Sequence, residues 1–301
     1  MLMNNQRRIG FIGSGRVATA LGQAFASAGE NVVAVASRSR HRAEACASGI
    51  AGCAAFDTAQ QVVDTSDLVF LAVTDDAIAP LVESLHWRAG VMVVHCSGAT
   101  ALSALAPAQA YGVAIGSFHP LLMFSDPETA LRSLPDCAIA LEAREPLLAT
   151  LEVLVRKLGS QSLFVPPEAR AAYHAASHYG AAFVCVLLDQ GMKILAAGGM
   201  KDDVSRRALL ALARSTLDAI EKSDPAHAMA GVYARGDAGT ARRHVEALDA
   251  IKPPVATLYR DLARHSIALA EQANRIDGPV ADALRSVLGD GEKSPGPPTE
   301  S

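Results

Sequence analysis

The sequence predicts an α/β fold in which a doubly wound parallel sheet is followed by an all-α domain. Apolar, strand-like runs alternate with amphipathic stretches from residue 8 to about residue 165, as in βαβ units. After Pro166-Pro167 the apolar period becomes helical and stays so to about Asn274. The chain has 301 residues, more than one compact domain usually holds, so two domains are expected.

The expected strands are short apolar runs bounded by polar or turn-forming residues. They span residues 8–12, 31–36, 68–73, 91–95, 114–118, 137–141 and 162–165. A helix over 145–158 crosses between the last two strands, which are therefore parallel. The first domain is expected at 7–165.

The second half reads as helices that break at glycines and prolines. Its first helix, expected over 168–197, would be about 45 Å long at 1.5 Å per residue, more than a small domain covers by itself. We therefore expect this domain, residues 166–288, to form a homodimer through its helices. The Gly-, Pro- and Ser-rich tail, residues 289–301, is expected to be disordered.

Composition excludes several classes of protein. The formal charge of −4 and the lack of a basic stripe argue against a nucleic-acid partner. Charged residues interrupt the apolar runs before about 18 residues, so no membrane span is expected. The chain begins without a signal-like apolar segment, and its five cysteines form no C-x-x-C pair. These features predict a cytoplasmic protein with free thiols and no metal site.

A glycine turn lies between the first expected strand and the first helix. Gly13 and Gly15 stand in a G-x-G-x-x-A pattern that Ala18 completes. Gly13 allows the tight turn, Gly15 lets the backbone approach a pyrophosphate, and the following helix N-terminus favours an anion. The pattern predicts a Rossmann dinucleotide-binding domain. Its expected cofactor-binding residues are Gly13, Ser14, Gly15, Arg16 and Val17.

The end of the second strand predicts which dinucleotide binds. NAD-selective sites usually carry an acidic residue there, but this chain reads Ser37-Arg38-Ser39-Arg40. Hydroxyl and guanidinium groups suit a 2′-phosphate, so NADP is the expected cofactor, with Ser37, Arg38 and Ser39 as contacts. The alternative is that these arginines are solvated residues at a helix start.

The third expected cofactor segment lies at the carboxyl end of the strand at 68–73. Val73 and Thr74 are expected beside the ribose and nicotinamide, because ligands lie at the carboxyl ends of parallel strands. Asp75 and Asp76 come next. Their expected role is to cap the following helix, and the alternative is a pair of catalytic carboxylates.

Two further strand ends carry candidate catalytic residues. Ser97 precedes Gly98 and is a candidate to orient substrate, with a turn or cap as the equal alternative. His119 precedes Pro120, and its imidazole is a candidate for proton transfer, against a purely structural hydrogen bond.

The helical half adds two more candidates. His174 and His178 share one helix face, and His174 is expected to contact substrate, with ordinary packing or a dimer interface as the alternative. A pair of histidines without H-E-x-x-H is a weak zinc signal, so no metal is expected. Arg235 is expected to bind a substrate carboxylate, either in its own subunit or in the neighbouring subunit of the dimer.

Several segments together resemble proteins that carry a Rossmann-like domain followed by a DUF2520 domain, near pyrroline-5-carboxylate reductase and the 6-phosphogluconate dehydrogenase-like enzymes. The matching segments are 13–17, 97–98, 118–121, 173–176 and 234–240. The resemblance implies an NADP-binding domain, a dimerising helical domain and a cleft between them. The His119-Pro120 pair is also similar to one in prephenate dehydrogenase. The chain lacks the G-S-G-P-A-Y-like helix of pyrroline-5-carboxylate reductase and the K-x-x-N-N of β-hydroxyacid dehydrogenases.

The resulting hypothesis is an NADP-dependent oxidoreductase that transfers hydride to or from a small carboxylate-bearing keto, imino or hydroxy compound. His119 would transfer the proton, Ser97 and His174 would orient the substrate, and Arg235 would hold its carboxylate. The alternative is an NADP-binding sensor without turnover, because the catalytic lysine pattern is missing.

Overall fold

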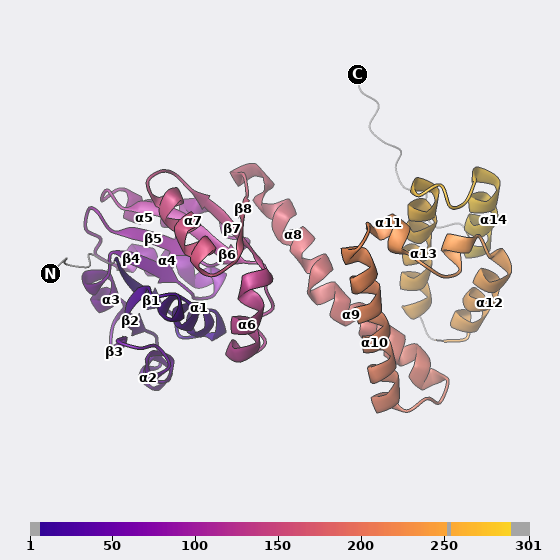
Figure 1. Cartoon of the computed structure of the whole chain (residues 1–301), viewed down its shortest axis with the longest axis horizontal. Coiled ribbons are helices and arrows are strands. Elements are labelled where there is room, and N and C mark those ends of the chain that lie inside the picture. The colour runs from indigo at the N-terminus through magenta and orange to yellow at the C-terminus, as the bar shows by residue number, and fades with distance from the viewer. Residues whose placement is uncertain (1–6, 252–253, 290–301) are drawn as a thin grey trace, which may run out of the picture. The chain divides into compact units, whose positions relative to one another are not determined.

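The computed structural model describes residues 7–251 and 254–289. The chain divides into two compact units, one up to Ala181 and one from Ala182 (Figure 1). This division falls after the helix that follows Pro167, whereas the sequence placed it at 165/166. The predicted disordered tail lies, from residue 290 onward, outside the described residues.

The first unit is built on one eight-stranded sheet in the order β3-β2-β1-β4-β5-β6-β7-β8 (Figure 1). The strands are β1 (Arg8–Ile12), β2 (Asn31–Ala36), β3 (Ala54–Phe56), β4 (Leu68–Leu71), β5 (Met92–His95), β6 (Ala114–Pro120), β7 (Ala138–Ala143) and β8 (Gln161–Phe164). The order reverses direction at β1 and β4, which is the topological switch point of a doubly wound sheet. The predicted α/β fold is confirmed.

Neighbouring strands are parallel except for β6 and β7, which pair antiparallel with Phe118 opposite Leu141. The sheet is therefore mixed rather than wholly parallel. The sequence missed this reversal because an antiparallel neighbour needs no crossover helix, and residues 121–137 carry no strong periodic signal. It also missed β3, which has only three residues and no fully buried one.

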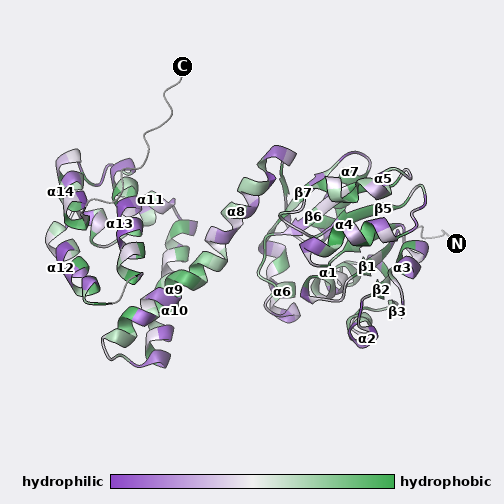
Figure 2. Ribbon diagram, turned by 180° about the vertical axis from the view of Figure 1, so that it is seen from behind, coloured by the Kyte–Doolittle hydropathy of each residue, from purple (hydrophilic) through white to green (hydrophobic). Residues whose placement is uncertain are grey.

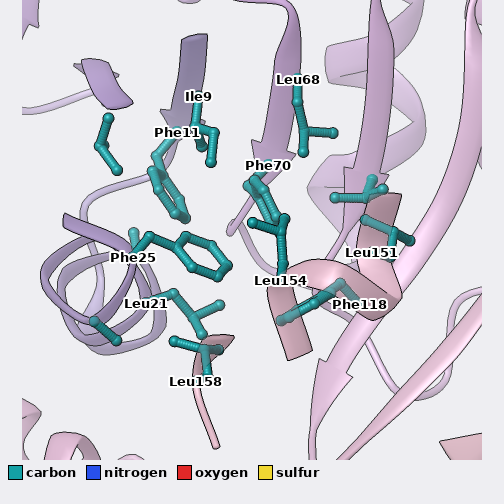
Figure 3. Close-up of a cluster of buried hydrophobic side chains, with 14 of the residues drawn as sticks. Ile9, Phe11, Leu21, Phe25, Leu68, Phe70, Phe118, Leu151, Leu154 and Leu158 are labelled. Carbon is teal, nitrogen blue, oxygen red and sulfur yellow. The ribbon is translucent and has the colours of Figure 1, made fainter. Parts of the chain in front are cut away.

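Two apolar cores cover the two faces of the sheet. On one face, rings of Phe11, Phe25, Phe70 and Phe118 pack against one another with centroids 5.1 to 6.3 Å apart (Figure 3). Helices α1 (Arg16–Ser27) and α7 (Leu147–Lys157) supply Leu21, Leu151 and Leu154 to the same core. Burying each such side chain stabilises the fold by roughly 1.5–3 kcal/mol. This core fixes the strand ends that carry the site.

The other face is covered by shorter helices, whose core residues include Val62, Ile78 and Val82. The remaining helices of the first unit are α2 (Arg40–Ser48), α3 (Ala59–Thr65), α4 (Asp75–Ser84), α5 (Ala106–Gln109), α6 (Pro127–Ser133) and α8 (Arg170–Gly180), with 3₁₀ turns η1 (Leu102–Leu105), η2 (Leu134–Asp136) and η3 (Pro167–Ala169). The helix predicted over 168–197 is interrupted at Ala181, whose φ of −125° and ψ of −91° are not helical.

The second unit is helical among its described residues. It comprises α9 (Ala182–Ala197), α10 (Asp202–Glu221), α11 (Pro225–Ala228), η4 (Tyr233–Arg235), α12 (Ala238–Asp249), α13 (Val255–Gln272) and α14 (Gly278–Leu288). Helices α12, α13 and α14 share a core around Ala241, Ile267 and Leu284.

Helices α9 and α10 pack on each other but leave much apolar surface uncovered. None of the described side chains of α9 is buried, although the helix is mostly hydrophobic (Figure 2). Val186, Leu187, Leu212 and Leu217 are 44 to 65% exposed. The stretch Pro167–Ala197 is long and apolar enough, with a hydropathy of 1.5, to cross a membrane by length and composition. The sequence interpretation expected charged residues and glycines to interrupt every such stretch, whereas this one passes by length and composition alone.

Candidate functional site

Gly13 makes the tight turn after β1. Its φ of +111° is in the region that favours glycine, and an added Cβ would lie 2.2 Å from the carbonyl oxygen of Ala72. Its N–H donates to the carbonyl of Ala36 over 2.8 Å. The turn is therefore wedged between the ends of β2 and β4, where no side chain fits.

Gly15 plays a different part. It is the N-cap of α1, and a Cβ there would meet nothing within 4 Å. It lines a cavity of about 640 Å³ at the carboxyl ends of β1, β2 and β4. A side chain at position 15 would enter this cavity. Glycine leaves the space open, as the close approach of a pyrophosphate to the backbone requires. The N-terminus of α1 begins at this glycine, and a helix N-terminus favours an anion.

The cavity collects most of the predicted cofactor residues. It is lined by Ile12, Gly13, Ser14, Gly15, Ala36, Ser37, Arg38, Ser39, Arg42, Asp57, Ala59, Ala72, Val73, Thr74, Ala77 and Leu81. Two predicted contacts, Arg16 and Val17, are not among these lining residues. Arg16 donates from Nη1 to the Ser125 carbonyl over 3.0 Å, and Val17 packs against the core.

The serines after β2 already have partners inside the protein. The hydroxyl of Ser14 donates to that of Ser37 over 2.8 Å, and Ser37 donates to the Ser39 carbonyl over 2.9 Å. Ser39 caps α2 by accepting from the backbone N–H of Arg42. These hydrogen bonds hold the loop between β2 and α2, which carries the neighbouring arginines.

The arginines of this loop separate into two kinds. Arg40 pairs with Glu44 and Asp57, each over 2.8 Å, and does not line the cavity. Arg38 and Arg42 line it, and within the described chain neither is in an ion pair. Sequence reasoning missed Arg42, although its place four residues after Arg38, at the start of the helix, was a usable signal. Two guanidinium groups therefore remain available to a ligand.

Asp75 and Asp76 do not cap α4. Thr74 is its N-cap, without a side-chain hydrogen bond, and both aspartates lie in the first turn. Carboxylates there interact favourably with the helix dipole without capping. The charge of Asp75 also opposes the lowering of the His119 pKa that is described below. His119 lies at the carboxyl end of β6, which only β5 separates from β4, so it is on the same edge of the sheet as the cavity.

Ser97, His119 and His174 come together in the first unit. Ser97 is buried and its hydroxyl accepts from the backbone N–H groups of Ala99 and Thr100 over 3.2 and 2.9 Å. This is the turn-stabilising role that was the alternative for Ser97, and it leaves the hydroxyl hydrogen available to a ligand. A Cβ on Gly98 would lie 2.7 to 2.9 Å from both His119 and His174, so glycine makes room for the two rings.

His119 is the most perturbed member of the cluster. Its Nδ1 lies 2.6 Å from the hydroxyl of Tyr173, and the His174 ring meets it edge-on at 6.4 Å between centroids. Burial, and then the charges of His174 and Arg170, lower the pKa of His119 to about 4 against the opposing effect of Asp75. His119 is therefore neutral at physiological pH. His174 in turn packs on His178 at 4.9 Å, and the described residues contain no group arranged to hold a metal ion.

Arg170 holds this cluster together, and sequence reasoning did not find it. It is 5% exposed at the start of α8 and pairs with Glu142 of β7. It also donates to the Ser117 hydroxyl over 2.8 Å and to the carbonyls of Ser97 and Gly98 over 3.5 and 3.4 Å. No sequence signal marks one arginine among others on an amphipathic helix, because its partners come from three distant segments.

Arg235 belongs to the second unit, where it ends η4 and is exposed. The next residue, Gly236, has a φ of +70°, and Asp237 caps α12 by accepting from Thr240. The predicted contact between Arg235 and a substrate carboxylate stays a prediction.

Comparisons with known proteins agree with this organisation. Residues 2–120 match the Rossmann-like domain family, and residues 137–266 match the DUF2520 family, a domain of unknown function. A search of curated proteins found no match. Many solved structures share the fold.

Three of these structures span nearly the whole chain. Protein TM1727 from Thermotoga maritima has a TM-score of 0.71 at 21% identity, covering 88% of this chain and 99% of that one. Reductive aminase from Aspergillus terreus, in complex with NADPH and ethyl-5-oxohexanoate, has a TM-score of 0.59 at 16% identity, covering 94% and 93%. 1-Pyrroline-5-carboxylate reductase from Streptococcus pyogenes has a TM-score of 0.61 at 15% identity, covering 94% and 100%. Along the chain, a match to the Rossmann-like domain family is thus followed by a match to the DUF2520 family.

Proposed function

We propose that this protein is an NADP-dependent reductase or dehydrogenase of small carboxylate-bearing keto, imino or hydroxy compounds. The observation that carries the proposal is the cavity lined by Gly13 and Gly15, which also holds two arginines without ion-pair partners among the described residues. The His119 cluster lies on the same edge of the sheet. The glycine turn fits a pyrophosphate, and Arg38 with Arg42 fits a 2′-phosphate. The reductases of similar fold support the same reading.

When bound, the reduced nicotinamide supplies a hydride to the substrate carbon. The chain's own groups would do the rest. His119 transfers the accompanying proton, Ser97 and His174 orient the substrate, and Arg235 of the second unit binds its carboxylate. Because Gly98 has no side chain, it leaves room for both imidazoles.

The test is a direct titration of the full-length protein with NADPH and NADH, followed by NADPH consumption across a panel of 2-oxo acids and cyclic imines. We expect NADPH to bind more tightly than NADH and at least one compound to be reduced. Binding without turnover on any compound would favour an NADP-binding sensor instead. Tighter binding of NADH would overturn the assignment of the cofactor.

Arg235 has its own test once a substrate is known. Replacing it by alanine should raise KM for a carboxylate substrate while the Kd for NADPH stays unchanged. An unaltered KM would remove Arg235 from the site.

We also propose that the chain forms a homodimer through its second unit. The uncovered apolar side chains of α9 and α10 support a protein partner, since large exposed apolar patches mark interaction surfaces. The Asp189–Lys193 ion pair in the middle of α9 favours this over a lipid environment, where charges are costly. Five free cysteines agree with a reducing compartment such as the cytoplasm.

A further inference from the structure

One contact of His119 plays no part in the proposed reduction. Its Nδ1 lies 2.6 Å from the hydroxyl of Tyr173, and the two rings are perpendicular, with centroids 5.8 Å apart. Tyr173 comes from the first turn of α8, whose start Arg170 anchors to β7. The contact therefore joins a strand end to a helix that is itself held in place.

The direction of this hydrogen bond follows from the chemistry of its two groups. Burial raises the pKa of Tyr173 to about 12, so the phenol keeps its proton. His119 is neutral, so one ring nitrogen is an acceptor. Within the described chain the Tyr173 hydroxyl has no other hydrogen-bond partner. With Nδ1 as the acceptor the phenol proton is satisfied within the protein, whereas with Nδ1 as the donor it would have to turn to solvent. The phenol is therefore the donor and Nδ1 the acceptor.

The other ring nitrogen then carries the proton. In a neutral imidazole with Nδ1 unprotonated, Nε2 is the N–H donor. Nε2 lies on the side of Gly98, where an added Cβ would be only 2.9 Å away. The loop at Gly98 is fixed in turn by the hydrogen bonds from Arg170 to the carbonyls of Ser97 and Gly98. The donor edge of His119 thus faces the space that a side chain at position 98 would fill and that glycine leaves open.

We propose that Tyr173 is a positioning residue that holds His119 in the Nε2–H tautomer and replenishes its proton during reduction. The inference rests on the proposed function and names its substrate class as compounds with a C=O or C=N bond. As the carbon accepts a hydride, the heteroatom takes the proton from Nε2, and Nδ1 takes the proton from the phenol. The phenolate recovers its proton from Nδ1 while a solvent proton restores Nε2, so one solvent proton is consumed for each hydride.

The relay is favourable in the forward direction because of relative basicity. An alkoxide or amide ion, formed as the hydride adds, is a far stronger base than a phenolate, even with the Tyr173 pKa raised to about 12. Without Tyr173 the imidazole would have to become an imidazolate. Tyr173 thus avoids that species without touching the substrate.

The first test needs neither cofactor nor substrate. In full-length protein labelled with ¹⁵N-histidine, long-range ¹H–¹⁵N spectra at neutral pH should show His119 with Nδ1 unprotonated and Nε2 protonated. His119→Gln assigns the signals. Tyr173→Phe should convert them to a mixture of tautomers, and Tyr111→Phe, at an exposed tyrosine, should leave them unchanged. An Nδ1–H tautomer in the unaltered protein, or no change in a folded Tyr173→Phe variant, would overturn the proposal.

The second test uses turnover, once the panel yields a substrate. Tyr173→Phe should lower kcat by roughly 10²-fold, in line with the loss of acid–base catalysis, with little change in KM or in the Kd for NADPH. A change confined to KM would contradict the relay. Because the tautomer is read without turnover, a protein that binds NADPH but reduces nothing would disprove the proposed function and still leave the hydrogen bond measurable.

Discussion

At the scale of single residues, burial and neighbouring charges set the pKa values of the histidines in and next to the site. His95 ends β5 and is completely buried, and within the described chain neither ring nitrogen has a hydrogen-bond partner. Burial, followed by the charges of Arg170 and His119, lowers its pKa from 6.5 to about 4. Sequence alone showed a histidine at a strand end but not that it would be enclosed.

His95 predicts a pH dependence of stability. Because its folded pKa lies below its ordinary value, the unfolded chain takes up a proton first, and the free energy of unfolding falls as pH drops from about 6.5 to about 4. His95→Leu should remove on the order of 2 kcal/mol of this fall, since it removes the titrating group. Urea unfolding across this pH range measures the effect. His41→Gln, at an exposed histidine, is the control, and an unchanged slope in His95→Leu would contradict the prediction.

Gly15 predicts a change in binding without a change in stability. Its Cβ would enter the cavity without meeting any protein atom, so Gly15→Ala should weaken NADPH binding at least tenfold and leave Tm nearly unchanged. Isothermal titration and thermal unfolding measure the two quantities. Gly278 is equally open but lies in the second unit, so Gly278→Ala should change neither binding nor Tm. If Gly15→Ala and Gly278→Ala bound NADPH with equal affinity, the cavity at Gly15 would not be the cofactor site.

Arg38 and Arg42 predict cofactor selectivity. Arg38→Ala and Arg42→Ala should each raise the Kd for NADPH about tenfold, because each removes a cation that pairs with the 2′-phosphate. NADH lacks that phosphate and is the matched control in the same variants, where its Kd should hardly move. Equal losses for both cofactors would mean that these arginines do not read the phosphate.

At the scale of elements, a buried ion pair helps to attach α8 to the sheet. The Arg170 and Glu142 side chains are 7 and 13% exposed, and removing one partner leaves the other charge buried. Arg170→Met should therefore destabilise the first unit by about 3 kcal/mol or more. Hydrogen exchange should show faster opening of α8. The double variant with Glu142→Gln should recover part of the loss.

The matched control for this ion pair lies on α6. Arg132 and Glu128 form an exposed pair one turn apart, so Arg132→Met should cost less than about 1 kcal/mol. If the Arg170 and Arg132 variants lost equal stability, the buried pair would not be what holds α8.

Elements also show how far sequence reasoning reaches. The bounds of β1 and β2 were predicted to the residue, because apolar runs next to a glycine turn are a strong local signal. The antiparallel β7, the break at Ala181 and the anchoring of α8 by Arg170 depend on contacts between distant segments. Likewise, Ser97, His119 and His174 were predicted as candidates. Tyr173 gained its place only through the folded geometry, whereas Arg42 carried a local signal that was missed.

At the scale of the whole molecule, the two units differ in how they cover their apolar surface. The first unit buries both faces of its sheet, whereas α9 and α10 leave theirs open among the described residues. The order of a Rossmann-like domain and a DUF2520 domain was predictable because each carries several local motifs. For the exposed apolar surface of α9 and α10, the sequence predicted only that a second copy of the chain would cover it.

The dimer can be tested by charge substitution. The protein should sediment at twice the monomer mass, and Leu212→Glu combined with Leu217→Glu should yield the monomer, because charge on an apolar interface is costly. Val153→Glu, at an exposed apolar position on α7, is the control. A monomeric wild-type protein that floats with phospholipid vesicles would instead assign the surface to a membrane.

The two ends of the sheet have a consequence for solubility. Edge strands expose unpaired backbone groups and are the usual starting points for aggregation. Here β3 has three residues and β8 has four, and Pro166-Pro167 follow β8 closely, without N–H groups to extend the ladder. The sheet therefore offers a second molecule few unpaired backbone groups to add to at either edge.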